Sequence, residues 1–535
     1  TLGNSSNNLL RIPGLGSTDG HVLTYSTSSG GIVLAAAGGG GGGASSLNGL
    51  SDCLVDTNSL YVGEVPGSLS GNPQGNTILG IDAGESLTSG DSNTLIGNNA
   101  GDSITSGTNS VAIGLDALSS LSTGGSNIAI GKNAYKSGTA SNNVYIGLDA
   151  GTSANSGIYQ IGIGSAAGNS NTGSNSIGIG WFANRNNSAT GTISIGHQAG
   201  YSNTSGATNT YIGYQSGYNT TTGGDNTYIG FQNGYSASGS RNTSVGDGSF
   251  GGGFGHTGSD NASLGYLALQ APTGASNYNV AMGSEALRAG GTKSNNVGIG
   301  YKAGTALATG EGNTFIGYQA GLSANPSGGS SGQNTCIGNT SGGAITTGIY
   351  NTFLGSLSGN GGGGSSAKVT TGNFNTMLGY GAKGNSSAIA NATSLGYQAQ
   401  STGSNQVTLG DSSIGTLRCQ ATSITAVSDE RDKTEIEDLG YGLAFIDALQ
   451  PRQFVWDNRA ETDGDGKEFY SANKGKKDFG FIAQEVKELD NDTLRLVYDE
   501  DPNRLELSYG KLVPILVKAI QELKEEVEIL KSQNK

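Results

Sequence analysis

The sequence predicts a mainly β protein, in which a parallel β-solenoid shaft of about twenty coils precedes a small α+β domain that ends in a helix. Three observations predict this fold class. A short apolar run closing on a glycine recurs along residues 72–415, 95 of the 535 residues are glycine, and charged residues crowd into the stretch 428–535. Such a glycine-rich chain, with 34% hydrophobic residues, is poor material for an ordinary globule. We therefore expect it to repeat itself.

The repeat is aligned on the glycine that closes each apolar run. Twenty copies occur at a nearly constant spacing, and the residue before the glycine is apolar in all of them. Three residues before the glycine stands Thr, Val or Ile in nineteen copies. One narrow apolar edge cannot bury itself, so stacking of the copies as a solenoid is expected. The anchor glycines are Gly80, Gly97, Gly114, Gly131, Gly147, Gly164, Gly180, Gly196, Gly213, Gly230, Gly246, Gly265, Gly283, Gly300, Gly317, Gly338, Gly355, Gly379, Gly396 and Gly410.

Each run is expected to form a short strand with two different faces. Residues two apart share a face, so we expect the residues one and three before each glycine to point into the shaft. The residue between them varies, from Ala112 to Tyr145 to Gly162, and we expect it to point outward. Fourteen copies carry Asn four residues before the glycine, for example Asn76 and Asn93. Stacked amides at this position predict a hydrogen-bonded ladder.

Composition also sets the expected segment boundaries. The stretch 428–535 holds 16 of the 27 Lys and Arg and 25 of the 41 Asp and Glu, which leaves 11 and 16 for everything before it. Two differently built modules follow from this division. The expected segments are a Gly-rich attachment or linker segment at 1–45 with a hairpin within 16–37, a lead-in at 46–71, the shaft at 72–415, a linker at 416–427 and the C-terminal domain at 428–535.

The end of the chain predicts its clearest helix. Six apolar residues there are spaced 3-4-3-4-3, which is the seam of a coiled coil over 512–531, with Glu and Lys outside the seam. Pro514 is tolerated only in a first helical turn, so the helix should begin near residue 512. The alternative is one amphipathic helix packed on its own domain. The seam residues are Val513, Leu516, Ile520, Leu523, Val527 and Leu530.

A serine and a lysine stand five residues apart at the point where the glycine-rich sequence ends and the charged stretch begins. Ser428 and Lys433 lie in the sequence Ser-Asp-Glu-Arg-Asp-Lys. A neutral lysine amine can activate a serine hydroxyl without histidine. The alternative is an ordinary polar turn, in which this spacing is common.

Four motifs carry a resemblance that favours the first interpretation. In order they are SDERDKTEIEDL, GYGLAFIDALQPRQFVW, GFIAQEV and LSYGKLVPILVKAIQELKEEVEILK, within residues 428–531. They resemble the C-terminal intramolecular chaperone of phage tail spikes, tail fibres and endosialidases. The resemblance implies that this domain trimerises the fibre and then cuts itself off. It further implies Ser428 as nucleophile, Lys433 as its base and Val427–Ser428 as the scissile bond.

The repeat carries a second resemblance. Its runs, such as NSVAIG at 109–114 and NNVYIG at 142–147, are similar to the β-roll head of trimeric autotransporter adhesins and to related arrays in phage fibres. This resemblance implies a homotrimer, in agreement with the trimerising domain behind the shaft.

Aromatic residues recur at fixed places after the anchor glycines. Tyr201, Tyr218 and Tyr235 each stand five residues after one, and Tyr214 and Phe231 stand one residue after one. Stacked coils would align them as ladders. Aromatic side chains bind sugars, so these five residues are candidate glycan contacts, although they can equally pack between coils or across subunits.

Composition argues against several other functions. The net charge of −14 does not suit nucleic acid, which needs a basic surface. The sequence has no apolar run long enough to span a membrane, and neither a cofactor nor a metal site is expected. The scattered Asp and Glu of the shaft are interpreted as solubilising residues, not as paired glycosidase carboxylates.

The sequence is therefore interpreted as a phage tail fibre or receptor-binding protein of the virion tail. We expect the N-terminal segment to attach to the tail or baseplate, the shaft to contact a host surface glycan or receptor, and the C-terminal domain to assemble the trimer. Two alternatives stay open, namely a polysaccharide depolymerase tail spike and a trimeric adhesin of the bacterial cell surface.

Overall fold

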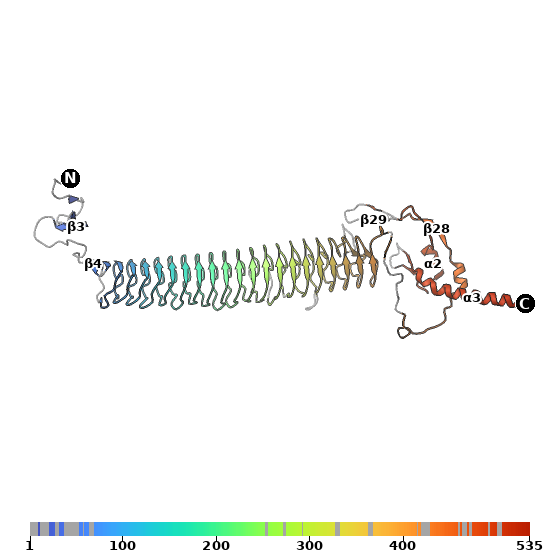
Figure 1. The fold of residues 1–535 in the computed structure, drawn as a ribbon, viewed down its shortest axis with the longest axis horizontal. Coiled ribbons are helices and arrows are strands. Elements are labelled where there is room, and N and C mark those ends of the chain that lie inside the picture. Colours follow the sequence, from blue (N-terminus) through green and yellow to red (C-terminus); the bar gives the residue numbers. More distant parts are fainter. Residues whose placement is uncertain are drawn as a thin grey trace. The chain divides into compact units, whose positions relative to one another are not determined.

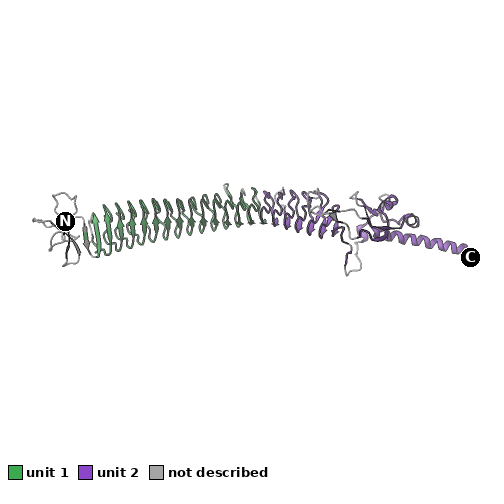
Figure 2. Cartoon of the chain, turned by 90° about the horizontal axis from the view of Figure 1, so that it is seen from above, with its two compact units in different colours: residues 1–299 green, residues 300–535 purple. Residues whose placement is uncertain are grey.

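A computed structural model describes most of the chain as two compact units, residues 1–299 and 300–535 (Figure 2). Each unit is described here by itself. The described residues are 9–10, 21–26, 31–36, 53–56, 58–63, 69–251, 255–270, 274–291, 293–326, 332–361, 368–414, 416–418, 428–457, 461–462, 468–469, 473–490, 493–499 and 505–534.

The first unit begins with antiparallel strands. Strand β1 (Leu9–Leu10) pairs with β2 (His21–Ser26), which pairs with β3 (Gly31–Ala36), so the hairpin predicted within 16–37 is confirmed. Strand β4 (Cys53–Asp56) then pairs antiparallel with β5 (Ser59–Gly63), and β5 pairs parallel with the first repeat strand.

The rest of the first unit is a ladder of parallel strands, drawn as a row of arrows in Figure 1. Each strand pairs with the strand of the next coil in strict register, as where Thr94 lies opposite Val111 and Ile96 opposite Ile113. The strands are β6 (Thr77–Gly80), β7 (Thr94–Ile96), β8 (Val111–Ile113), β9 (Ile128–Ile130), β10 (Val144–Ile146), β11 (Ile161–Ile163), β12 (Ile177–Ile179), β13 (Ile193–Ile195), β14 (Thr210–Ile212), β15 (Thr227–Ile229), β16 (Thr243–Val245), β17 (Ala262–Leu264), β18 (Val280–Met282) and β19 (Val297–Ile299).

The second unit opens with the same kind of ladder. Its register is also preserved, with Thr335 opposite Thr352 and Ile337 opposite Leu354. A short parallel pair, β24 (Lys383–Gly384) with β26 (Gln400–Ser401), accompanies its last coils. The ladder strands are β20 (Thr314–Ile316), β21 (Thr335–Ile337), β22 (Thr352–Leu354), β23 (Thr376–Leu378), β25 (Thr393–Leu395) and β27 (Val407–Leu409).

All twenty glycine-terminated runs thus form strands, and they bound about nineteen coils. The predicted mainly β, parallel solenoid is confirmed. The anchor glycines are required by close packing between coils. Gly97 has φ +131°, and a Cβ there would lie 2.7 Å from the carbonyl oxygen of Gly114. A side chain at this position would therefore separate the two coils.

The predicted orientation of the strands is wrong. The middle residue of each run points into the coil, and the residues one and three before the glycine lie on the outer face of the sheet. Leu95, Ala112 and Tyr145 are fully buried, whereas Leu79 and Leu264 are each 47% exposed. The physical reason is the narrow interior, which holds one side chain per strand, so that a large ring is accommodated beside a small residue or stacked on the ring of the next coil, as Tyr211 stacks on Tyr228. Gly162, in the coil after Tyr145, shows this, because a Cβ on it would lie 2.4 Å from the Tyr145 ring.

A second wall closes the interior opposite the strands. Three residues after the anchor glycine stands a buried alanine in many coils, for example Ala83 and Ala100. Seven residues after the glycine, Leu87, Ile104 and Leu121 fill the remaining space. Small and medium side chains in these two positions allow a short stretch of chain to close each coil.

The predicted asparagine ladder is confirmed. The Asn93 side chain donates from Nδ2 to the Oδ1 atom of Asn76 at 3.2 Å, and the Asn93 backbone N–H donates to the same oxygen at 2.9 Å. The same pattern recurs where Asn261 contacts Asn242 and where Asn279 contacts Asn261. These amides are buried, so each bond satisfies polar groups that would otherwise be unpaired.

The C-terminal part of the second unit is a small α+β domain. Its core contains Phe445, Leu449, Val486, Leu496, Val497, Leu512 and Ile515. The last helix begins at Leu512 with Pro514 in its first turn, as predicted. None of the helices in the described residues combines the length and apolar character needed to cross a membrane. The elements are η2 (Glu430–Asp432), α1 (Leu443–Ala448), β28 (Arg452–Val455), β29 (Glu461–Thr462), β30 (Glu468–Phe469), β31 (Lys477–Gly480), α2 (Ala483–Asp490), β32 (Val497–Tyr498), β33 (Glu506–Leu507), η3 (Tyr509–Lys511) and α3 (Leu512–Gln533).

One coil of the first unit carries a histidine in its interior. His256 is fully buried, and its ring centroid lies 4.2 Å from that of Phe250. Its Nδ1 atom accepts a hydrogen bond from the Gly258 N–H at 2.9 Å. Burial, with a smaller contribution from the positive charge of the buried Lys293, lowers the pKa of His256 to about 4. The neutral imidazole is therefore the form that the folded shaft accommodates.

We predict an acid-sensitive shaft because the unfolded chain binds a proton at His256 more readily than the folded one. Between the unfolded pKa of about 6.5 and the folded value, falling pH should remove up to about 3 kcal/mol of stability. His256 occupies the interior position that Leu87 and Leu121 occupy in other coils. The variant His256→Leu should therefore lose less stability at low pH. The measurement is the thermal unfolding midpoint at pH 7 and pH 4. An equal fall for the two proteins would contradict the prediction.

Candidate functional site

The structure brings Ser428 and Lys433 together. The Lys433 Nζ atom lies 2.7 Å from the Ser428 Oγ atom and 3.0 Å from the Ser428 carbonyl oxygen. Both distances are within hydrogen-bond range, so the amine contacts the hydroxyl whose proton a base would have to accept. Val427, on the other side of the predicted scissile bond, lies outside the described residues.

A short turn between the two residues makes this contact possible. Asp429 caps η2 by accepting the Arg431 N–H at 2.9 Å, and Lys433 ends the turn with its own N–H donating to the Glu430 carbonyl at 3.0 Å. The Arg431 guanidinium and backbone N–H also hold the pKa of Asp429 below its usual range. A local hydrogen-bonded turn thus sets the direction from which Lys433 reaches back to Ser428.

Both side chains of the pair are exposed in the single chain. A serine hydroxyl hydrogen-bonded to an amine is an arrangement that can perform nucleophilic attack on a neighbouring carbonyl. Removal of water from the lysine would favour its neutral form, which is the form that acts as a base. Within residues 428–433 the hydrogen bond between the Ser428 and Lys433 side chains is present, but both side chains are exposed to water.

The domain behind this turn is fixed by contacts to its last helix. The Glu522 carboxylate of α3 accepts the Leu443 N–H at 2.7 Å and so caps the first turn of α1. The buried Asp490 accepts the N–H groups of Leu494 and Leu496 and shapes the chain after α2. The Tyr509 hydroxyl accepts the Phe481 N–H at 3.1 Å. The first bond ties α1 to α3, the Asp490 bonds fix the chain after α2, and the last bond ties Phe481 to η3, which precedes α3.

The candidate glycan contacts form two ladders in the first unit. The rings of Tyr201, Tyr218 and Tyr235 stack in sequence, with centroids 5.0 Å apart in both steps and interplanar angles of 15° and 13°. Tyr214 and Phe231 stack separately, with centroids 5.1 Å apart. Stacking occupies the ring faces between neighbours, so the ring edges and the hydroxyl groups of the ladder are what a ligand can reach.

Sequence reasoning missed members of both ladders. Trp181 and His197 extend the Tyr214 ladder, with the His197 ring 4.8 Å from the Tyr214 ring and 7° from parallel. Phe182 contacts Tyr201 edge-on, and the Arg185 guanidinium lies over both of their rings. The signal for Trp181 and His197 was present, because each stands one residue after an anchor glycine, as Tyr214 does.

The outward residues of the strands form an exposed apolar stripe, which sequence reasoning also missed. We define the aliphatic stripe as the residues one and three before each anchor glycine. Several members of the stripe in each unit are more than a third exposed. They include Leu79, Ile128, Ile163, Ile179, Ile195, Leu264 and Met282 in the first unit and Leu354, Leu378, Leu395, Val407 and Leu409 in the second.

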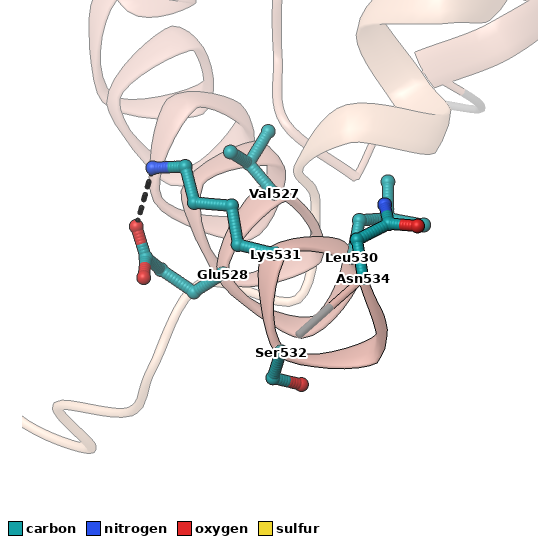
Figure 3. A pocket seen from close by; sticks show the side chains of 6 residues that line it. All are labelled: Val527, Glu528, Leu530, Lys531, Ser532 and Asn534. Atoms are coloured by element: carbon teal, nitrogen blue, oxygen red, sulfur yellow. Dashed lines mark hydrogen bonds and ion pairs between the residues drawn. The ribbon is translucent and has the colours of Figure 1, made fainter.

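The last helix has an exposed apolar face of the same kind. Leu512, Ile515 and Ala519 of α3 pack on the domain, whereas the predicted seam faces away from the domain core. Ile520 is 65% exposed and Leu530 56%. Toward the helix end a shallow hollow is lined by five residues of α3 and by Asn534, which caps the helix (Figure 3); the five are Val527, Glu528, Leu530, Lys531 and Ser532.

Comparison with known proteins finds a family match within the C-terminal α+β domain. Residues 428–495 match the model of a peptidase family described as chaperone of endosialidase, and the match begins at Ser428. No match to a curated protein was found. The chain thus combines a parallel β-solenoid with a C-terminal domain of the chaperone-of-endosialidase family, which is the combination of a tail fibre that carries its own chaperone domain.

Proposed function

We propose that this protein is a homotrimeric phage tail fibre or receptor-binding protein, located in the virion tail, whose C-terminal domain trimerises the chain and then cleaves itself off. The observation that carries the proposal is that one chain leaves two apolar surfaces uncovered, the aliphatic stripe and the seam of α3, next to a domain of a chaperone family.

Magnitudes favour association through the aliphatic stripe. Covering an aliphatic side chain that is more than a third exposed contributes about 0.5–1 kcal/mol, so the twelve such residues of the stripe contribute on the order of 10 kcal/mol per chain. This is comparable with the roughly 4–15 kcal/mol that association costs in lost freedom. Long contiguous apolar surfaces are rare on monomers and are typical of interfaces.

The seam of α3 supports the same proposal. It is too short to form a stable coiled coil by itself, but one face of the helix is already packed on the domain core. Three such helices would bury Leu516, Ile520 and Leu523 against one another. The domain would then join three chains before their glycine-rich coils stack. The entropic cost of bringing the chains together would thus be met at this first step, and the later stacking of the coils would cost less.

The proposed cleavage uses the Ser428–Lys433 contact. The Ser428 oxygen forms a bond to the Val427 carbonyl carbon while neutral Lys433 accepts the hydroxyl proton. The bond between that carbon and the Ser428 nitrogen then breaks, and the proton passes from Lys433 to the departing amine. Water hydrolyses the resulting ester, which yields a carboxyl group on Val427 and restores the Ser428 hydroxyl. Assembly would cover the exposed pair and so favour the neutral amine.

Substitution of the pair should separate cleavage from assembly. We expect Ser428→Ala to abolish the fragments 1–427 and 428–535, and Lys433→Ala to slow their formation by about 10²–10⁴-fold, because a general base is lost. Both variants should remain trimeric. Intact mass spectrometry measures the fragments, and Ser423→Ala is the matched control. Fragments of the same mass from Ser428→Ala would refute the assignment.

Substitution in the seam should impair assembly. Ile520→Glu would place three carboxylates at the centre of the helix bundle, and we expect the yield of soluble trimer to fall at least about tenfold, which corresponds to about 1.4 kcal/mol or more. Lys524→Glu introduces the same residue outside the seam and should leave the yield unchanged. Light scattering after size-exclusion chromatography measures the assembly. Equal yields for the two variants would count against trimerisation through α3.

We propose in addition that the N-terminal segment attaches to the tail or baseplate and that the shaft contacts a host surface glycan. Tyr201, Tyr218 and Tyr235 are the preferred contacts, because their ladder leaves a row of ring edges and hydroxyls. Tyr214 and Phe231 are kept as further candidates.

Changes in the tyrosine ladder test this contact. Replacement of Tyr201, Tyr218 and Tyr235 by Phe keeps the stacking but removes three hydroxyls, each able to contribute about 0.5–1.5 kcal/mol through a hydrogen bond. We expect the triple Phe variant to lose about tenfold in adsorption to host cells, and the triple Ala variant to lose more. Unchanged adsorption by both variants, with the trimer intact, would exclude the ladder as a receptor site.

A further inference from the structure

Two exposed rows run along the edges of the aliphatic stripe. We define the leading row as the residues five before each anchor glycine and the trailing row as the residues one after it. Tyr159 and Tyr278 of the leading row are 56% and 61% exposed, and Trp181 and Tyr266 of the trailing row are 49% and 52% exposed. The two rows flank the stripe, because in each coil they stand two residues before and two residues after its members.

Residue size in the two rows is coupled coil by coil. Tyrosine occupies the leading row in three coils, and serine occupies the trailing row in the same three coils and in no other. The three pairs are Tyr159 with Ser165, Tyr278 with Ser284, and Tyr350 with Ser356.

The opposite combination occurs as well. Where the trailing row has Trp181 or Tyr318, the leading row has Asn175 or Gly312. Charge is also matched in one coil. Arg241 is the one basic residue of the leading row, and the trailing residue of its coil is Asp247. Both are exposed, and Arg241 also pairs with Asp260 of its own row. Size and charge thus complement each other at the same coil.

This coupling has no cause within one chain. The two rows lie on either side of each three-residue strand and are six residues apart in sequence, which is about 20 Å of extended chain. The tyrosines also occupy left-handed backbone, with φ 58° at Tyr159, 57° at Tyr278 and 59° at Tyr350. Most other coils place Asn, Asp, Ser or Gly there, which tolerate this conformation better. A contact outside the chain would explain the exposed rings of Tyr159 and Tyr278 on strained backbone, whereas Tyr350 also stacks on Phe374 of its own row.

We infer that the leading row of one copy of this chain packs against the trailing row of the next copy, at the same coil. This inference rests on the homotrimer proposed above. It adds which edges meet and in which register. The contact is heterologous, because two different edges join, and three copies close it into a ring around the aliphatic stripe. Each leading tyrosine then fills the space that a trailing serine leaves on the neighbouring copy.

One coil of the second unit departs from the pattern. Phe374 and Tyr380 are both large, and this coil, which runs from Gly355 to Gly379, is longer than any other between two anchor glycines. The Phe374 ring stacks on Tyr350 of its own row, with centroids 5.3 Å apart and planes 5° from parallel. Tyr380 likewise stacks on Tyr397 in the trailing row. The two rings are thus held within their own rows.

Engineered cysteines test the register directly. In full-length protein with Cys53, Cys336 and Cys419 replaced by Ser, we would introduce Tyr159→Cys together with Ser165→Cys and oxidise under mild conditions. The Cα atoms of a disulfide lie within about 7 Å, so these two cysteines cannot bridge within one chain. The matched control carries Tyr159→Cys with Ser284→Cys, which belong to different coils.

The expected result is a covalent trimer on a non-reducing gel from the same-coil pair, at least tenfold more abundant than from the control. The pair at Tyr278 and Ser284 gives an independent test if the first variant fails to fold. Light scattering separates the two levels of the proposal. A trimer without same-coil cross-links, or with equal cross-linking in the control, overturns the register inferred here, whereas a monomer overturns the proposed homotrimer itself.

Discussion

The narrow interior of each coil is the constraint on which the rest of the shaft depends. One side chain per strand enters the coil, and a large one such as Tyr145 fits there beside Ala129 and Gly162 of the neighbouring coils. The two other side chains of each strand must then lie outside, although the residue before the glycine is apolar in all twenty runs. A coil can close in so few residues because a buried alanine wall faces the strand and an anchor glycine allows the next coil to approach. In the single chain the interior of each coil is therefore filled, whereas apolar side chains on the outer face of the strands remain exposed.

In the proposed homotrimer, the same regularity would leave the three chains with a problem of alignment. Backbone ladders and glycine contacts recur in nearly every coil and Asn occupies the ladder position in fourteen of the twenty runs, so these features stabilise stacking but distinguish few coils from one another. Irregular residues can distinguish them. Tyrosine at the leading edge, serine at the trailing edge and the charges of Arg241 and Asp247 differ from coil to coil. In the proposed trimer, the C-terminal domain would start the alignment, and the matched edges would maintain it along the coils.

The C-terminal domain shows how one helix can serve two purposes. Leu512, Ile515 and Ala519 of α3 belong to the domain core, and Glu522 caps α1, so the helix is fixed before any partner arrives. Its other face remains uncovered. The exposed Ser428–Lys433 contact is similar in this respect, because its geometry is present in the single chain while its desolvation is not. In the proposed trimer, assembly would cover the seam of α3 and remove water from the Ser428–Lys433 contact.

The sequence by itself determined the strands, the anchor glycines, the asparagine ladder and the start of α3, because each follows from local spacing or from the conformational limits of Gly and Pro. The Ser428–Lys433 turn was also predictable, since five residues separate its ends. Only the tertiary structure decided which face of each strand lies inside. Alternation shows that a strand has two faces but not how wide the coil is, and it is the coil width that admits Ala112 or Gly162 and sends Ile113 or Ile163 to the outer face.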